Sequence, residues 1–187
     1  SFVRLGRTLV DAGFRVVIIG GGGDRPLGDR VAGEIGPGAI NSCGKTGVGE
    51  LGAVLARASA LVTGDTGPMH MAVAVGTPVV GLFFGPASPF DTGPYAADQV
   101  VLHTGAPCAP CDHNVTCLEP FCRDELPPDG VAALVTARIA DDWSAIETLA
   151  RSLYPARVYR TGFEDGGRFI ATTLGNPPRR REDMLRD

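Results

Sequence analysis

The chain has 187 residues, of which 44% are hydrophobic, and its formal net charge is -4 at pH 7. This length suits one domain with an appendage or two small domains, each able to bury a core. The slight acidic excess argues against a general nucleic-acid-binding protein, which normally presents a basic face. No apolar run reaches the roughly 20 residues of a membrane-spanning helix. The opening residues begin a helix-like pattern rather than a signal peptide.

Apolar runs and amphipathic stretches alternate along the first 142 residues. The predicted strands are residues 15–19, 39–43, 60–63, 79–83 and 100–102. The predicted helices are residues 2–12, 26–35, 48–58, 68–75 and 128–140. This alternation is typical of an α/β fold, an open parallel sheet with helices on both faces. Such sheets bind their ligands at the carboxyl ends of the strands.

The pattern changes at about residue 143. Residues 143–153 are predicted to form a helix, and two strand-like stretches, 157–160 and 168–174, predict a hairpin around 164–167. The arginine-rich stretch 176–181 is predicted to be an exposed tail. We therefore expect an α/β domain over residues 1–142 and a C-terminal appendage over residues 143–187.

The turn from Asp65 to His70 follows the third predicted strand and leads into a helix. Pro68 suits the first helical turn, because its fixed φ fits and its missing N–H is not needed there. The free N–H groups from about Gly67 onward, with the positive end of the helix dipole, favour an anion, typically a phosphate. His70 can add a donor to the same anion; the alternative is a histidine in the core. The turn therefore predicts a nucleotide-diphosphate site.

Glycine-rich turns also follow the first two predicted strands. The run Gly20–Gly23 lacks complete GxGxxG spacing, so a plain strand-to-helix turn is an equal alternative. Asp24 can accept hydrogen bonds from ribose hydroxyls or cap the next helix. Residues 41–49 either line a base pocket or only turn the chain, and Glu50 is expected to begin a helix, where the dipole favours an acid. All three turns are expected at one edge of the sheet.

Two further loops contain candidate site residues. Residues 85–95 are rich in Gly and Pro and either border the site or merely cross the sheet edge. Four cysteines then lie within 15 residues: Cys108, Cys111, Cys117 and Cys122. Four thiolates at this spacing can hold a structural zinc ion, with His113 as a substitute ligand. Reduced buried thiols, a local disulfide and, less well supported, a redox site are the alternatives.

Taken in order, the motifs from Val16 to about Val135 resemble the C-terminal half of glycosyltransferase family 9, the ADP-heptose:lipopolysaccharide heptosyltransferases. The matching motifs are Ile18-Ile19-Gly20-Gly21, Gly49-Glu50-Leu51, Asp65-Thr66-Gly67-Pro68-Met69-His70, Gly76-Thr77-Pro78, Leu82-Phe83-Phe84-Gly85-Pro86, Thr92-Gly93-Pro94-Tyr95 and the cysteine loop. The resemblance implies a Rossmann-like half of a GT-B glycosyltransferase, which binds the nucleotide-sugar donor.

The resemblance implies a set of donor-binding residues: Gly22, Asp24, Thr46, Gly47, Asp65, Thr66, Gly67 and His70. The stretch 65–70 would surround the diphosphate and sugar, Asp24 the ribose, and Thr46 with Gly47 the adenine. In the best-known members the donor is ADP-L-glycero-D-manno-heptose, and transfer inverts the anomeric centre without a metal. Prepositioned N–H donors would stabilise the charge that grows on the leaving diphosphate.

The general base of the family, and a basic residue that reaches the phosphates, have no counterpart in the chain. We expect both in an N-terminal half, which would also bind the lipopolysaccharide inner-core acceptor. The chain alone is then predicted to bind donor weakly and to transfer nothing. A cytoplasmic location is expected, with peripheral contact with the inner membrane left open.

Two other interpretations stay open. One is a non-enzymatic nucleotide-binding module in which the cysteine loop holds a metal. The other is a different GT-B enzyme, such as a nucleotide-sugar epimerase, because a shared fold does not fix the reaction.

Overall fold

The computed structural model describes residues 2–111, 116–118, 121–123 and 125–175. Its elements in chain order are α1 (Phe2–Asp11), β1 (Val16–Ile18), η1 (Gly22–Asp24), α2 (Arg25–Ile35), β2 (Ala39–Asn41), α3 (Val48–Ala56), β3 (Leu61–Thr63), α4 (Gly67–Ala74), β4 (Val79–Phe83), α5 (Pro89–Thr92), β5 (Val100–His103), η2 (Phe121–Arg123), α6 (Pro128–Ile139), α7 (Trp143–Ser152), β6 (Arg157–Phe163) and β7 (Phe169–Thr173). Each predicted strand and helix is present, with small shifts at the ends. The short helix α5, inside the Gly/Pro loop, was not predicted.

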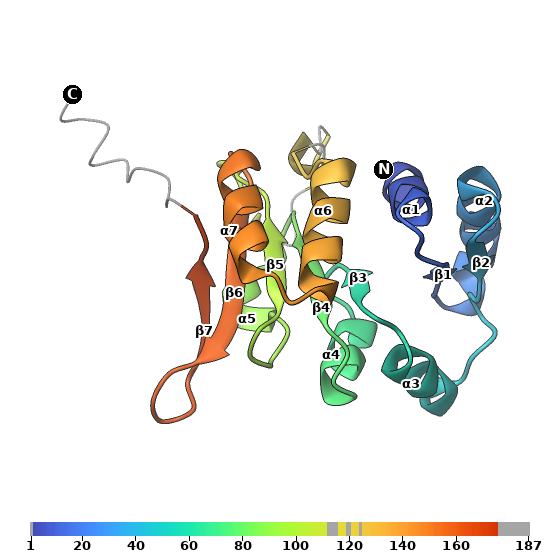
Figure 1. The fold of residues 1–187 in the computed structure, drawn as a ribbon, viewed down its shortest axis with the longest axis horizontal. Helices are drawn as coiled ribbons and strands as arrows, with labels where there is room; N and C mark the ends of the chain where they lie inside the picture. Colours follow the sequence, from blue (N-terminus) through green and yellow to red (C-terminus); the bar gives the residue numbers. More distant parts are fainter. Residues whose placement is uncertain (1, 112–115, 119–120, 124, 176–187) are drawn as a thin grey trace.

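The strands form two sheets rather than the one continuous sheet expected from the sequence. Strands β1 and β2 pair in parallel, and a second sheet has the order β3-β4-β5-β6-β7. Its first three strands are parallel, whereas β6 and β7 are antiparallel. Figure 1 shows the β1–β2 pair with α1 and α2 at one end of the molecule and the β6–β7 hairpin at the other.

Strand β1 is less buried than its apolar sequence suggests. Val17 is 45% exposed, and Ile40 on β2 is 43% exposed. Successive side chains of a strand point to opposite faces, and Val16 and Ile18 are more buried than Val17. A two-stranded sheet thus covers one set of its side chains and leaves the other accessible.

The main sheet is covered on both faces, as predicted. Val80, Val100 and Leu102 lie in a cluster with residues of α1, α6 and α7. Figure 1 shows α6 and α7 along one face of this sheet, with α1 beside them next to β1. Val101 and Phe83, which alternate with these three strand residues, lie in a second cluster with residues of α3 and α4. This alternation is the period-two pattern of strands buried on both sides.

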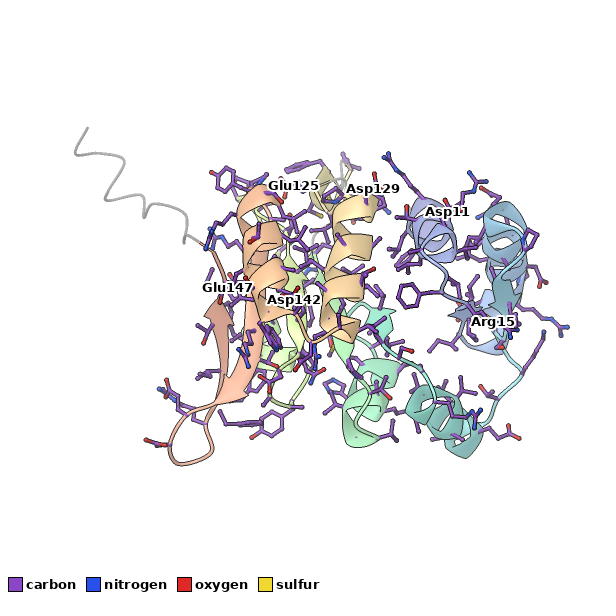
Figure 2. The ribbon with its side chains drawn as sticks, viewed as in Figure 1. Asp11, Arg15, Glu125, Asp129, Asp142 and Glu147 are labelled. Carbon is purple, nitrogen blue, oxygen red and sulfur yellow. The ribbon has the colours of Figure 1, made fainter. Side chains whose placement is uncertain are left out.

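Helix α1 is fixed to α6 by a polar contact as well as by the core. Arg4 Nε donates a hydrogen bond of 3.1 Å to Asp129 Oδ1, and Asp129 lies at the end of α6 nearest α1 in Figure 2. Thr8 Oγ1 also donates to this carboxylate, at 3.3 Å. Because α1 leads into β1, these contacts help to place the β1–β2 pair beside the main sheet. None of the described helices combines the length and apolar character needed to cross a bilayer.

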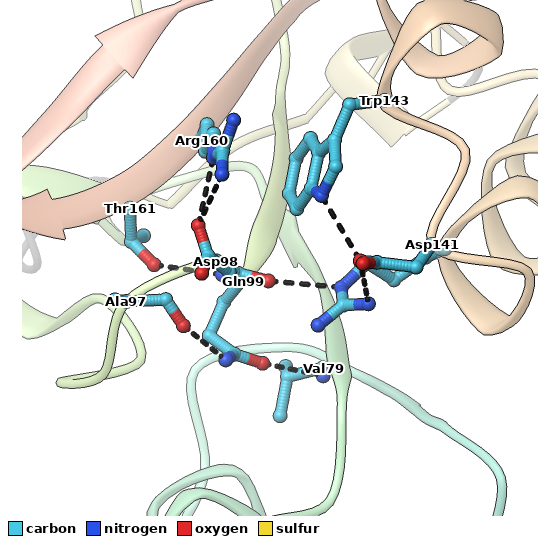
Figure 3. Close-up of polar contacts among 9 residues, drawn as sticks. Val79, Ala97, Asp98, Gln99, Asp141, Trp143, Arg160 and Thr161 are labelled. Carbon is cyan, nitrogen blue, oxygen red and sulfur yellow. Dashed lines mark hydrogen bonds and ion pairs between the residues drawn. The ribbon is translucent and has the colours of Figure 1, made fainter.

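The predicted C-terminal helix and hairpin are confirmed as α7, β6 and β7. Strand β6 pairs with β5, and Ile146 of α7 and Val158 of β6 lie in the same cluster as the parallel strands. Figure 3 shows how a polar contact joins this region to the loop before β5: Arg160 Nε donates to Asp98 Oδ1 at 2.8 Å. In the same view Trp143 Nε1 donates to Asp141, in the connection between α6 and α7, at 3.0 Å. The domain boundary at residue 142 stays a prediction, and residues 176–187 lie outside the described residues.

Candidate functional site

The turn after β3 presents an open helix N-terminus. Thr66 has an extended backbone (φ -149°, ψ 161°) and α4 begins at Gly67. The N–H of Met69 donates to Thr66 O at 3.0 Å, whereas the N–H of Gly67 finds no acceptor within the described residues. Met69 is fully buried, but Gly67 and His70 are exposed. The alternative of a core histidine at position 70 is therefore wrong, and the helix end faces solvent with its donors.

The side chains of this turn are held by neighbours. Thr66 Oγ1 and Thr63 Oγ1 share a hydrogen bond of 2.9 Å. Thr92 Oγ1, at the end of α5, donates to Asp65 Oδ2 at 2.6 Å. The Gly/Pro loop that contains α5 thus contacts the turn, in agreement with the interpretation that residues 85–95 border the site. One carboxylate oxygen of Asp65 is engaged by this contact.

The glycine turn after β1 is closed by its own acid. Asp24 Oδ2 accepts a hydrogen bond of 2.8 Å from the N–H of Gly21, and the N–H of Asp24 donates to Gly21 O at 3.1 Å. The Asp24 side chain makes no capping hydrogen bond to α2; it binds the Gly21 N–H in the glycine turn instead. A carboxylate over this amide disfavours an anion at the same place. Gly22 and Asp24 are both exposed residues.

The turns after β1 and β2 lie against each other. The N–H of Gly44 donates to Gly20 O at 2.9 Å. A Cβ placed on Gly44, which has φ +67°, would lie 2.7 Å from Gly22 Cα, so only glycine allows this approach. Further along, Glu50 Oε2 accepts a hydrogen bond of 2.8 Å from the N–H of Gly47. Glu50 thus lies in the first turn of α3, near the helix start where it was predicted. Thr46, which lies between the two contacts in the sequence, is half-buried.

Beneath these turns lies Asn41, which the sequence analysis did not single out as a functional residue. Its side chain is buried and donates to Arg25 O at 3.1 Å and to Asp29 Oδ1 at 2.7 Å. Its Oδ1 accepts from the N–H of Cys43 at 2.9 Å. Burial raises the pKa of the Cys43 thiol, and the nearby Asp24 carboxylate raises it further. The available signal was a polar residue at the end of an apolar strand.

The predicted site residues thus fall into two groups. The structure joins the turns that carry Gly22, Asp24, Thr46 and Gly47, and it joins the Asp65–His70 turn to α5. Within the described residues, no hydrogen bond links the two groups. Both lie at carboxyl ends of parallel strands, where α/β sheets bind ligands. The arrangement offers the Gly67 N–H for an anion at α4 and polar groups for a neutral, hydroxylated ligand at the neighbouring turns.

The four clustered cysteines are free thiols. The interpretation as reduced buried thiols holds for Cys122, which is buried, and is wrong for Cys108 and Cys117, which are exposed. Within the described residues, no three His, Cys, Asp or Glu side chains are placed to hold one metal ion; His113 lies outside them. The N–H of Cys111 donates to Gly85 O at 3.0 Å, which places this loop beside the exit of β4.

One further polar residue, His103, was missed. It ends β5, is 7% exposed, and has no hydrogen-bond partner at either ring nitrogen within the described part of the chain. Burial lowers the pKa of His103, and the positive charge of Arg157 lowers it further. The ring is therefore a neutral, unsatisfied group at the carboxyl edge of the sheet.

Comparison with known proteins decides the family. A sequence model of glycosyltransferase family 9 (heptosyltransferase) matches residues 1–121. The chain belongs to this family. It is 31% identical over 105 residues to lipooligosaccharide heptosyltransferase 2 of Haemophilus influenzae, a match that covers 54% of this chain and 30% of that protein. It is 32% identical over 110 residues to lipopolysaccharide heptosyltransferase 2 of Escherichia coli, covering 56% and 31%.

Solved structures of the family agree with the fold. The structure of E. coli ADP-heptose LPS heptosyltransferase II matches with a TM-score of 0.63 and 25% identity, over 76% of this chain and 41% of that one. A glycosyltransferase family 9 protein from Veillonella parvula matches with a TM-score of 0.52 and 29% identity, over 79% and 40%. The Rossmann-like GT-B fold expected from the sequence is confirmed. The chain spans about a third of the length of the two curated relatives described above.

Proposed function

We propose that this chain binds the nucleotide-sugar donor, of the ADP-heptose class, for an inverting glycosyl transfer in lipopolysaccharide core synthesis. The observation that carries the proposal is the solvent-facing N-terminus of α4, with a free Gly67 N–H and an exposed His70 directly after β3. Membership of family 9 supports the reaction class.

The charged part of the donor would lie at α4. The Gly67 N–H, the helix dipole and His70 favour the negative charge that grows on the leaving diphosphate as the glycosidic bond breaks. Asp65, held by Thr92 at 2.6 Å, orients the turn or a sugar hydroxyl rather than the phosphate. The free Gly67 N–H and the helix dipole supply positive potential at this end of α4.

The nucleoside would lie at the turns after β1 and β2. Asp24 has already engaged one oxygen with the Gly21 N–H, and its other oxygen is available to a ribose hydroxyl. Its negative charge directs the phosphates away from the glycine run and toward α4. Gly22, with Thr46 and Gly47, would then lie against the ribose and adenine.

The remaining parts of the activity are assigned to the rest of a longer enzyme. We propose that the general base and the lipopolysaccharide acceptor site belong to a second Rossmann-like half, and that this chain alone binds donor without transferring sugar. The reaction would take place in the cytoplasm at the inner membrane, where the acceptor is made. The segment 143–187 is proposed to be an appendage of the donor-binding domain.

The test is calorimetric titration of the purified chain with ADP and with UDP. A His70→Ala variant should weaken ADP binding about tenfold or more, since a hydrogen bond to a charged group contributes roughly 1.5–3 kcal/mol. UDP should bind more weakly than ADP. The matched control is Glu147→Ala, on α7 in the opposite helix layer (Figure 2), which should leave the ADP affinity unchanged. Equal ADP affinity in the His70 variant, or no ADP binding by the parent chain, would contradict the proposal, as would sugar transfer by this chain alone.

A further inference from the structure

The side-chain amide of Asn41 joins α2 to the turn that follows β2. Its Nδ2 donates to the backbone oxygen of Arg25 at 3.1 Å and to Asp29 Oδ1 at 2.7 Å. Its Oδ1 accepts from the N–H of Cys43 at 2.9 Å. Both amide hydrogens and the oxygen are thus used, in a residue that is 6% exposed. A buried amide with this set of partners can hold only one arrangement of its neighbours.

Two of the three partners, Arg25 and Cys43, lie in or directly beside the turns that carry the proposed nucleoside contacts. Arg25 directly follows Asp24, whose carboxylate closes the turn after β1. Cys43 begins the turn that leads to Thr46, and Lys45 Nζ returns to the backbone oxygen of Asn41 at 2.6 Å. The Asn41 amide and the contact between Gly44 and Gly20 therefore together set the distance between the two turns.

The backbone of α2 is shaped to fit this amide. A Cβ on Gly28 would lie 2.4 Å from Asn41 Oδ1 and 2.8 Å from Nδ2, so a side chain at position 28 would displace the amide. Gly28 is the buried residue of α2, in a helix whose interior glycine otherwise lowers stability. The close approach brings the first turn of α2, and with it Asp24, down onto Asn41.

We propose that Asn41 is a positioning residue for the nucleoside end of the donor. It rests on the proposed function: Asn41 touches no ligand itself, but holds the Asp24 and Thr46 turns at the separation that a ribose and base require. The phosphate end, bound at α4, does not depend on it. Loss of the Asn41 amide should therefore weaken binding of the nucleoside end and spare the phosphate end. A purely structural role of Asn41 would affect both ends alike.

The test compares ADP with inorganic pyrophosphate by NMR titration of the whole chain. Asn41→Asp keeps the acceptor for Cys43 but loses both donors and faces the Asp29 carboxylate. It should weaken ADP binding about tenfold or more, because the contacts that place the Asp24 turn against Asn41 are lost, and leave pyrophosphate binding within about twofold. Gln99→Glu is the matched control: it is also a buried amide, bonded to Val79 N at 2.7 Å at the amino ends of the strands. It should change neither affinity.

A second variant guards against unfolding of the first. Asp29 is exposed, so Asp29→Ala removes one of the three partners at low risk to the fold. It should weaken ADP binding several-fold without changing pyrophosphate binding. ADP affinity equal to the parent in both variants overturns the role of Asn41 and leaves the proposed function intact. Equal weakening of ADP and pyrophosphate also overturns it, and a parent chain that binds no ADP overturns both.

Discussion

Replacement of His103 by leucine should stabilise the protein. Both ring nitrogens of His103 lack a partner within the described residues, and the side chain is 7% exposed. A buried polar group without a hydrogen bond costs roughly 1–3 kcal/mol. Leucine has a similar volume and needs no partner, so His103→Leu should raise the free energy of unfolding by about this amount at pH 7. For a chain of this size the rise in Tm should be several degrees.

The pH dependence gives a second test of the same substitution. The pKa of His103 in the folded protein lies below its ordinary value of 6.5, so the unfolded chain takes up the proton first. Stability is then complete above about pH 6.5 and falls as the pH drops toward the folded-state pKa. The advantage of the leucine variant should therefore grow between pH 7 and pH 5.5.

Urea unfolding at pH 8, 7 and 5.5 measures both effects. The matched control is His70→Ala, because an exposed histidine should change stability by no more than about 0.5 kcal/mol. A leucine variant less stable than the parent at pH 7 would refute the reasoning, since the ring would then have a favourable partner. A difference between parent and variant that stays constant from pH 8 to pH 5.5 would refute the titration argument.

Two further predictions concern the C-terminal region. Arg160→Met removes the guanidinium that lies 3.9 Å from the centroid of the Trp143 ring and pairs with Asp98 (Figure 3); because these groups are partly exposed, urea unfolding should show a loss of only about 1–2 kcal/mol. Gly105→Ala would place a Cβ 2.1 Å from a proline carbonyl oxygen, so thermal unfolding should show a loss above about 3 kcal/mol. The control Gly49→Ala, which meets no atom within 4 Å in a helix, should not destabilise; losses of equal size in the two alanine variants would contradict the steric argument.

Local sequence patterns predicted the helices and strands, because buried positions recur with the residue period of a helix or of a strand. Val79–Phe83 is apolar on both faces, and the structure buries all five residues. Pairing between strands could not be predicted in the same way. The sequences of β1 (residues 16–18) and β3 (residues 61–63) do not reveal whether these two strands pair with each other. In the structure they do not pair, and Val16 and Val62 only share a core. The antiparallel addition of β6 to β5 likewise depends on contacts far apart in sequence.

For the candidate site, sequence predicted the turns but not what supports them. Gly67 and His70 were identifiable because helix starts have local signals, and the structure exposes both. Asn41 and His103 each end an apolar strand, and from sequence alone a polar residue at a strand end is equally consistent with burial or with exposure to solvent. The importance of both residues arises from burial, and that of Asn41 also from partners more than ten positions away, such as Arg25.

The division of the sheet bears on how the proposed donor site is held together. The nucleoside turns follow β1 and β2, and the phosphate turn follows β3, in the other sheet. Within the described part of the chain, no ladder of hydrogen bonds sets the distance between the two groups. This distance depends on the core shared by Leu9 of α1, Val16 and the main sheet, and on the Arg4–Asp129 contact. Side-chain packing is less directional than a hydrogen-bonded ladder. A ligand that spans both groups would therefore bind the two sheets to each other, and donor binding should stabilise α1, β1 and β2 more than the hairpin β6–β7.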